Sequence, residues 1–197
     1  MKLLLTSFGH PHLRDFATGT VAYIPDATRT FADHPDTQVE RTMLRDAGFT
    51  LLELPLATTA PAEVDRILGE VDAVYVAGGE TFDLLHIMRS TGTDEVLIRH
   101  VRAGLPYIGT SAGSVIAGPD IEPVSLLDSP AVAPELHDYR GLGLTNYVII
   151  PHVGTDIPQF PIDVFAETVR TYGKDHRLVL LRDGEALLID ETGTRLI

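Results

Sequence analysis

The chain contains no cysteine, and this absence excludes several kinds of chemistry at once. Disulfides, thiolate metal sites and a cysteine nucleophile all need that side chain, so covalent catalysis would have to use another nucleophile. Disulfides are rare in the cytoplasm, and a chain without cysteine fits that compartment. We therefore expect a cytoplasmic protein without disulfides.

Basic residues are scarce relative to acidic ones. The 15 Lys and Arg residues stand against 28 Asp and Glu, which gives a formal net charge of -13. A surface this acidic repels phosphate backbones. We expect no nucleic-acid partner.

Long apolar runs, linkers and metal-binding motifs are missing as well. No run approaches the roughly 20 apolar residues that span a bilayer, and segment 1–5 is too short for a signal peptide. His, Asp and Glu do not recur at the spacings of metal-binding motifs. We expect no membrane partner, no metal and no cofactor. The 197 residues, without internal repeats, fit one domain spanning 1–197.

What the sequence does contain is an alternation of short apolar runs with segments of helical period. The predicted strands are 3–6, 20–24, 51–54, 73–77, 107–110, 147–150, 178–181, 186–189 and 194–197. The predicted helices are 37–47, 61–68, 81–89, 94–103, 112–118 and 162–172. The pattern predicts an α/β fold built on a parallel sheet, and the last two strands predict a hairpin. Segment 121–143 is irregular, and loops of that length are usually functional.

Three groups of residues follow the carboxyl ends of predicted strands. They are the pair Gly78 and Gly79, then Ser111, then His152. In open parallel sheets ligands bind beyond these ends. Their coincidence predicts a site at one edge of the sheet.

Residues 109–113 read GTSAG, which matches the G-x-S-x-G nucleophile elbow. The motif needs a tight turn between a strand and a helix, with small flanking residues that leave the serine exposed. The predicted strand 107–110 and helix 112–118 supply that context. Ser111 is therefore our candidate nucleophile.

A serine hydroxyl needs a base, and His152 is the first candidate among eight histidines. It directly follows a predicted strand, which we expect to end at the same sheet edge as Ser111. His137 and His10 are alternatives. The acids at strand ends that follow His152 are Asp183 and Glu185. An order of nucleophile, histidine and acid resembles the class I glutamine amidotransferase architecture, but those enzymes use cysteine, so glutamine hydrolysis is disfavoured.

Four motifs together resemble the peptidase E family of serine peptidases, which includes cyanophycinase. They are residues 75–85 (YVAGGETFDLL), 109–113 (GTSAG), 151–152 (PH) and 183–186 (DGEA). Nearly the whole chain is covered by the resemblance. It implies a single three-layer domain with a flavodoxin-like, class I glutamine amidotransferase-like sheet, mostly parallel, with helices on both faces and a C-terminal hairpin.

The resemblance also implies roles for individual residues. Ser111 would attack the substrate, His152 would act as base and then as acid, and Asp183 would orient the histidine. Glu185 and Asp128 are alternatives for that acid. The backbone N–H groups of Gly79 and Ala112 would form the oxyanion hole. Gly78 would let the backbone approach the substrate.

The sequence departs from the family at one place that bears on specificity. Aspartate-specific members carry an arginine shortly after the elbow helix, whereas residues 118–123 here read GPDIEP. Glu122 would repel a substrate carboxylate there, but it could pair with a substrate α-ammonium group. Arg140, in the same long loop, could supply a cation instead.

We therefore expect a serine exopeptidase that hydrolyses small peptides, with an N-terminal preference not restricted to aspartate. The alternatives are a strict aspartyl dipeptidase, a general acyl hydrolase or esterase, and a non-catalytic binding domain on the same fold. A small peptide is the expected partner, and a homo-oligomer remains open.

Overall fold

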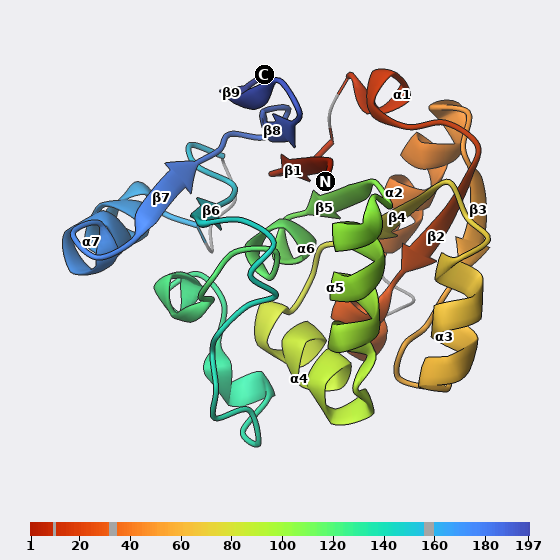
Figure 1. The fold of residues 1–197 in the computed structure, drawn as a ribbon. Helices are drawn as coiled ribbons and strands as arrows, with labels where there is room; N and C mark the ends of the chain where they lie inside the picture. Colours follow the sequence, from red (N-terminus) through yellow and green to blue (C-terminus); the bar gives the residue numbers. More distant parts are fainter. Residues whose placement is uncertain (10, 32–34, 156–159) are drawn as a thin grey trace.

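The structure of the protein is a computed structural model that describes residues 1–9, 11–31, 35–155 and 160–197 (Figure 1). Its centre is a seven-stranded sheet with the strand order β3-β2-β4-β5-β1-β8-β9. The strands of this sheet are β1 (Leu3–Thr6), β2 (Thr20–Ile24), β3 (Thr50–Glu53), β4 (Ala73–Val76), β5 (Tyr107–Thr110), β8 (Ala186–Asp190) and β9 (Gly193–Leu196). Strands β1 to β5 pair in parallel, whereas β8 pairs with β1 and β9 in antiparallel fashion.

Helices cover both faces of this sheet. They are α1 (Leu13–Phe16), α2 (Pro35–Asp46), α3 (Pro61–Leu68), α4 (Thr81–Thr91), α5 (Thr93–Ala103), α6 (Ala112–Val115) and α7 (Ile162–Tyr172), with short 3-10 helices η1 (Asp26–Phe31), η2 (Glu122–Val124) and η3 (Pro130–Val132). Helices α3 to α6 contribute to the larger core cluster, and α1 and α2 to a second cluster on the opposite face. The predicted three-layer α/β fold with a mostly parallel sheet and a C-terminal hairpin is thereby confirmed.

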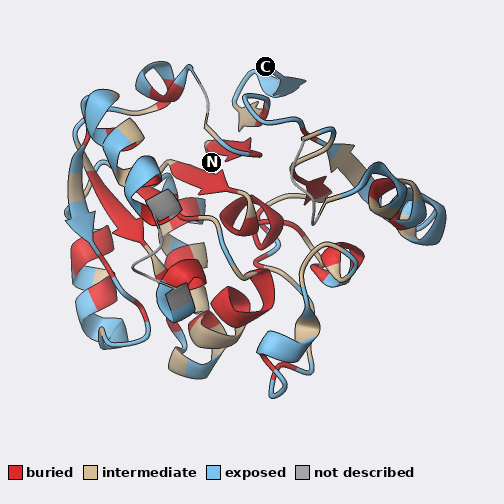
Figure 2. Cartoon of the chain, turned by 180° about the vertical axis from the view of Figure 1, so that it is seen from behind, coloured by how far each residue is buried: buried red, intermediate tan, exposed pale blue. Residues whose placement is uncertain are grey.

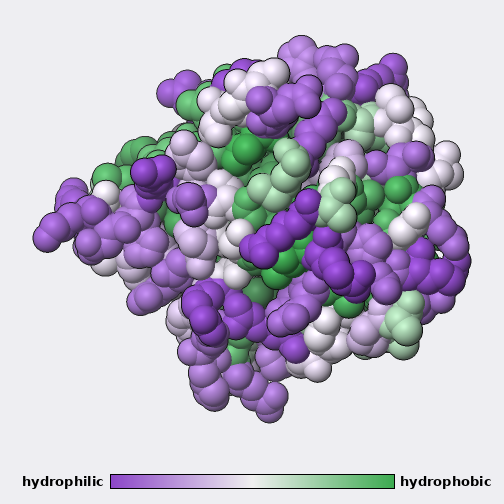
Figure 3. All heavy atoms as spheres, viewed as in Figure 1, coloured by the Kyte–Doolittle hydropathy of each residue, from purple (hydrophilic) through white to green (hydrophobic). Residues whose placement is uncertain are grey.

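Burial follows from these layers. All four positions of β1, β4 and β5 are buried, as expected for central strands covered on both faces. Figure 2 shows the buried residues in the central strands and on the inner sides of the helices. Polar residues cover most of the face in Figure 3. None of the helices in the described part of the chain is long and apolar enough to cross a membrane.

One strand expectation is wrong. Strand β6 (Tyr147–Ile150) pairs only with β7 (Arg177–Leu180), in a separate two-stranded parallel sheet, so His152 does not follow a strand of the main sheet. These two strands and α7 lie to one side of the main sheet in Figure 1. Residues Val148, Ile149 and Ile150 are nevertheless fully buried in the larger core cluster. Hydrophobic contacts, and not a shared ladder of hydrogen bonds, therefore hold β6 beside the main sheet.

The helix after Ser111 is also shorter than predicted. It ends at Val115, because Pro119 has no N–H to donate to the Val115 carbonyl. The carbonyl groups of Ile116 and Ala117 accept hydrogen bonds from Leu142 and Leu144 instead. Residues 142–144 therefore lie against the end of α6.

Candidate active site

Ser111 lies in a strained turn between β5 and α6. Its backbone angles are φ 47° and ψ -113°, and only His152 shares a positive φ among the described non-glycine residues. Such a conformation costs about 1–3 kcal/mol and persists only where the surroundings enforce it. Gly113 permits the tight turn, since a Cβ there would lie 2.1 Å from the carbonyl oxygen of Val76. The predicted elbow geometry is therefore present.

Ser111, His152 and Asp183 form a continuous chain of hydrogen bonds. The distance from Ser111 Oγ to His152 Nε2 is 2.8 Å, and that from His152 Nδ1 to Asp183 Oδ1 is 2.9 Å. An ionised Asp183 can only accept, so Nδ1 carries the proton and Nε2 is left to accept from the serine hydroxyl. The ring of Phe160 stacks on His152 with 5.1 Å between ring centres and 5° between ring planes. The imidazole is thus fixed on one face and at both nitrogens.

Two backbone N–H groups beside Ser111 have no acceptor among the described residues. Within the described residues, neither Gly79 nor Ala112 donates its N–H to another group of the chain. Gly79 has φ 137°, and a Cβ there would lie 2.3 Å from the carbonyl oxygen of Ala27. Only glycine allows the backbone at position 79 to lie this close to the backbone of Ala27. The adjacent Gly78 N–H donates to Glu40 at 3.3 Å and so points away from the reacting atoms.

The triad and the pair Gly78 and Gly79 line a cleft of about 670 Å³, together with Glu40 and two further acids from other elements. Glu80 precedes α4, and Asp128 follows η2 in the long loop. Burial raises the pKa of Glu80 to about 7, with further contributions from its hydrogen bond to Asp128 and from the Asp128 charge. Asp128 also accepts the Thr81 N–H at 2.5 Å. No Arg or Lys belongs to the cleft lining within the described part of the chain.

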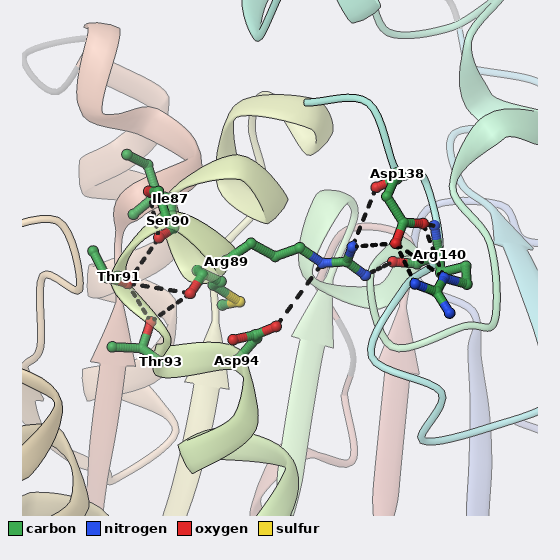
Figure 4. A network of polar contacts seen from close by, with 9 residues as sticks. Ile87, Arg89, Ser90, Thr91, Thr93, Asp94, Asp138 and Arg140 are labelled. Carbon is green, nitrogen blue, oxygen red and sulfur yellow. Dashed lines mark hydrogen bonds and ion pairs between the residues drawn. The ribbon is translucent and has the colours of Figure 1, made fainter. Parts of the chain in front are cut away.

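Two residues proposed for substrate binding lie outside this cleft. Glu122 is exposed in η2, and its side chain does not line the cleft. The Arg140 side chain forms an ion pair with Asp138, which also binds Arg89 from α4 (Figure 4). Hydrogen bonds from Arg140 hold the pKa of Asp138 below its usual range. The structure therefore does not bring Glu122 or Arg140 to Ser111, because the long loop turns both outward.

The alternative acids and bases are placed elsewhere. Glu185 accepts the Arg182 N–H at 2.9 Å within its own turn, and Asp128 binds Thr81 and Glu80, so neither reaches His152. His137 is exposed, and His10 lies outside the described residues. In the described part of the chain, no group of three or more His, Asp or Glu could hold a metal ion.

The sequence analysis missed two polar residues at this site. Ser7 directly follows β1, the neighbour of β5, so the strand-end rule that found Ser111 could also have found Ser7. Glu40 lies in helix α2 with its side chain turned toward the sheet, where it accepts from Tyr23, Tyr75 and Gly78. The available signal for Glu40 was its position in the sequence, one helical turn before Leu44, which places both side chains on the same face of the helix.

Comparison with known proteins identifies the family of the chain. The model of peptidase family S51 matches residues 3–197. An uncharacterized peptidase of Pasteurella multocida is 32% identical over 175 residues, which cover 86% of this chain and 84% of that protein. Peptidase E of Streptomyces coelicolor is 37% identical over 164 residues, or 77% of this chain and 64% of that protein. A crystal structure described as a peptidase E of Listeria monocytogenes has a TM-score of 0.89 at 28% identity, covering 100% of this chain and 97% of that one. The chain therefore belongs to peptidase family S51 and is a serine peptidase.

Proposed function

We propose that the protein hydrolyses small peptides with Ser111 as nucleophile, His152 as general base and Asp183 as the acid that orients the histidine. The supporting observation is the hydrogen-bonded chain of these three side chains at the cleft. The strained backbone at Ser111 adds support, because it lifts the hydroxyl out of the sheet edge.

The reaction follows from the positions of these atoms. Ser111 Oγ attacks the scissile carbonyl carbon while His152 Nε2 takes its proton, and the N–H groups of Gly79 and Ala112 receive the oxyanion. His152 then gives the proton to the leaving amine, which departs and leaves an acyl-enzyme. Water attacks this ester with His152 again as base, releasing the acid and restoring the serine. One oxyanion donor is worth about 100- to 1,000-fold in rate.

The charge of the cleft supports a preference for the substrate's N-terminus. The carboxyl groups of Glu80 and Asp128 complement an α-ammonium group, and the described lining offers no Arg or Lys for an aspartate side chain. We therefore propose an aminopeptidase-like exopeptidase or dipeptidase whose first-residue preference is not restricted to aspartate. Glu122 and Arg140 have no part in this proposal.

A dipeptide panel tests the proposal. We expect turnover of dipeptides that begin with Ala, Leu or Lys, and a loss of at least about 100-fold when the amine is acetylated, because the ammonium is then removed. Preferential turnover of dipeptides beginning with Asp would establish the strict aspartyl alternative instead. Turnover of simple esters without peptides would establish the acyl hydrolase alternative.

The nucleophile is tested with the same protein. Ser111→Ala should lower turnover by about 1,000-fold or more and should abolish labelling by a fluorophosphonate probe, since it removes the hydroxyl that is hydrogen-bonded to His152 Nε2. A matched control is Ser90→Ala, which removes an exposed serine of α4 far from the triad. Peptide turnover that persists in Ser111→Ala would remove Ser111 from the mechanism.

A further inference from the structure

Ser7 contacts each of the three residues of the proposed triad, and we infer that it is a positioning residue for the reaction. The inference rests on the proposed function, since it concerns the same three side chains. Ser7 directly follows β1 and is fully buried, with a relative exposure of 0%. It does not line the cleft and would not touch substrate.

Ser7 holds the nucleophile through its main chain. Its carbonyl oxygen accepts the Ser111 N–H at 3.0 Å, and the Thr6 carbonyl shares that donor at 3.1 Å. These bonds fix the strained Ser111 backbone against the end of β1. They do not depend on the Ser7 side chain and persist in any substitution at this position.

The Ser7 hydroxyl joins the other two residues, and its hydrogen-bond direction is determined. The His152 N–H lies 2.7 Å from Ser7 Oγ and can only donate, so the hydroxyl oxygen accepts there. Its single proton is then free for Asp183 Oδ1, 2.6 Å away. The same carboxylate oxygen accepts from His152 Nδ1 at 2.9 Å. The hydroxyl therefore closes a ring that runs from the His152 backbone through Asp183 to the His152 imidazole.

This ring connects two separate sheets. Ser7 and Ser111 follow strands of the main sheet, whereas His152 follows β6 of the two-stranded sheet and Asp183 lies in the turn after β7. No β-ladder joins the two sheets in the described part of the chain. His152 also has a positive φ of 64°, a strained conformation that its N–H bond to Ser7 helps to maintain. The hydroxyl thus sets the position of the base and of its acid relative to the nucleophile.

The surrounding backbone makes the side chain testable without loss of the fold. The Ser7 N–H donates to the Glu185 carbonyl at 3.3 Å, and the Gly184 N–H donates to the Phe8 carbonyl at 3.0 Å. Both bonds hold the turn that carries Asp183 beside β1 whatever the side chain at position 7. Removal of the hydroxyl should therefore change the alignment of the triad more than the docking of the turn.

The test uses the full chain with Ser7→Ala, Asp183→Ala and the double variant, assayed on the best substrate of the dipeptide panel. We expect Ser7→Ala to lower kcat about 10- to 100-fold with KM changed less than threefold, because the lost alignment acts in the transition state. In the Asp183→Ala background the same substitution should cost less than about threefold, because the acceptor Oδ1 that closes the ring is already removed. A residue with a merely structural role would cost the same factor in both backgrounds.

Two further variants separate alignment from folding. Ser7→Cys keeps the unbranched shape of the side chain, with a somewhat larger atom at its end, but replaces the hydroxyl by a weak donor and acceptor. It should lose at least as much kcat as Ser7→Ala, and urea unfolding of both variants checks that the fold is retained. Thr93→Val removes a buried hydroxyl of α5 that bonds to Thr91 and Met88, and kcat should stay within twofold.

Fluorophosphonate labelling of Ser111 provides a measure that needs no peptide substrate. Ser7→Ala and Ser7→Cys should slow it by the same factor as kcat. Labelling and turnover within twofold of the unsubstituted protein in both variants would overturn the inference while Ser111→Ala remained inactive. A protein that turns over every dipeptide equally well without Ser111 would instead overturn the proposed function.

Discussion

At the scale of single residues, Glu80 makes the pH dependence of the cleft predictable. Burial is the main reason that its pKa is raised to about 7 from the ordinary 4.5, followed by its hydrogen bond to Asp128 and by the charges of Asp128 and Asp83. Arg29 faces Asp83 and is bound to it by two hydrogen bonds of 2.6 Å. Between pH 4.5 and about pH 7, Glu80 holds a proton in the folded state but has lost it in the unfolded state. The contribution of this protonation to the unfolding free energy is therefore complete below about pH 4.5 and is lost as the pH rises through about 7.

Glu80→Gln removes this titration. Because Glu80 is only partly buried, solvent screening reduces the expected effect to about 1 kcal/mol of unfolding free energy between pH 4.5 and pH 8. Urea unfolding at a series of pH values should show a flatter profile for Glu80→Gln than for the unsubstituted protein. Glu95→Gln, on an exposed part of α5, is the control and should leave the profile unchanged. Parallel profiles for Glu80→Gln and the unsubstituted protein would contradict the expectation.

At the scale of elements, one buried acid attaches helix α2 to the sheet. Glu40 accepts from Tyr23 of β2 at 2.8 Å and from Tyr75 of β4 at 3.0 Å, and Tyr75 lies 2.6 Å from Thr110 beside the nucleophile. Glu40→Leu leaves both tyrosine hydroxyls without this acceptor, so we expect a loss of about 2–4 kcal/mol in urea unfolding. Glu40→Gln keeps one acceptor oxygen and should lose about half as much. Equal stability of the leucine variant would show that the network contributes no net free energy.

The elements also show what the sequence could and could not predict. The bounds of β1, β2, α3, β5, β6 and α7 agree with the predicted ranges, because hydrophobic period, proline and glycine act locally. The separate pairing of β6 and β7 was missed, since an apolar run indicates a strand but not its partner. Ser7 was missed for a related reason. Its place after a strand end was a signal, but Ser7 belongs to no motif that names a role, and its three contacts lie 104, 145 and 176 positions away in the chain.

At the scale of the whole molecule, net charge and cleft charge have the same sign. The chain carries a formal charge of -13, and the described cleft lining includes carboxyl groups but neither Arg nor Lys. Such a field raises the local concentration of cationic substrates and lowers that of anionic ones. Salt screens it, because the Debye length falls from about 30 Å at 0.01 M to about 8 Å at 0.15 M.

This field predicts opposite salt effects on two otherwise similar substrates. When sodium chloride rises from 0.01 M to 0.2 M, kcat/KM for a dipeptide beginning with Lys should fall about two- to fivefold, and that for one beginning with Glu should rise. A dipeptide beginning with Ala is the internal control for effects of salt on the chemical step, and its change is subtracted from the other two. Initial rates at substrate concentrations well below KM give the three slopes directly. Slopes of the same sign for Lys and Glu after this subtraction would mean that the acidic field does not act on the approaching substrate, and the preference for an N-terminal ammonium would then rest on Glu80 and Asp128 at contact distance alone.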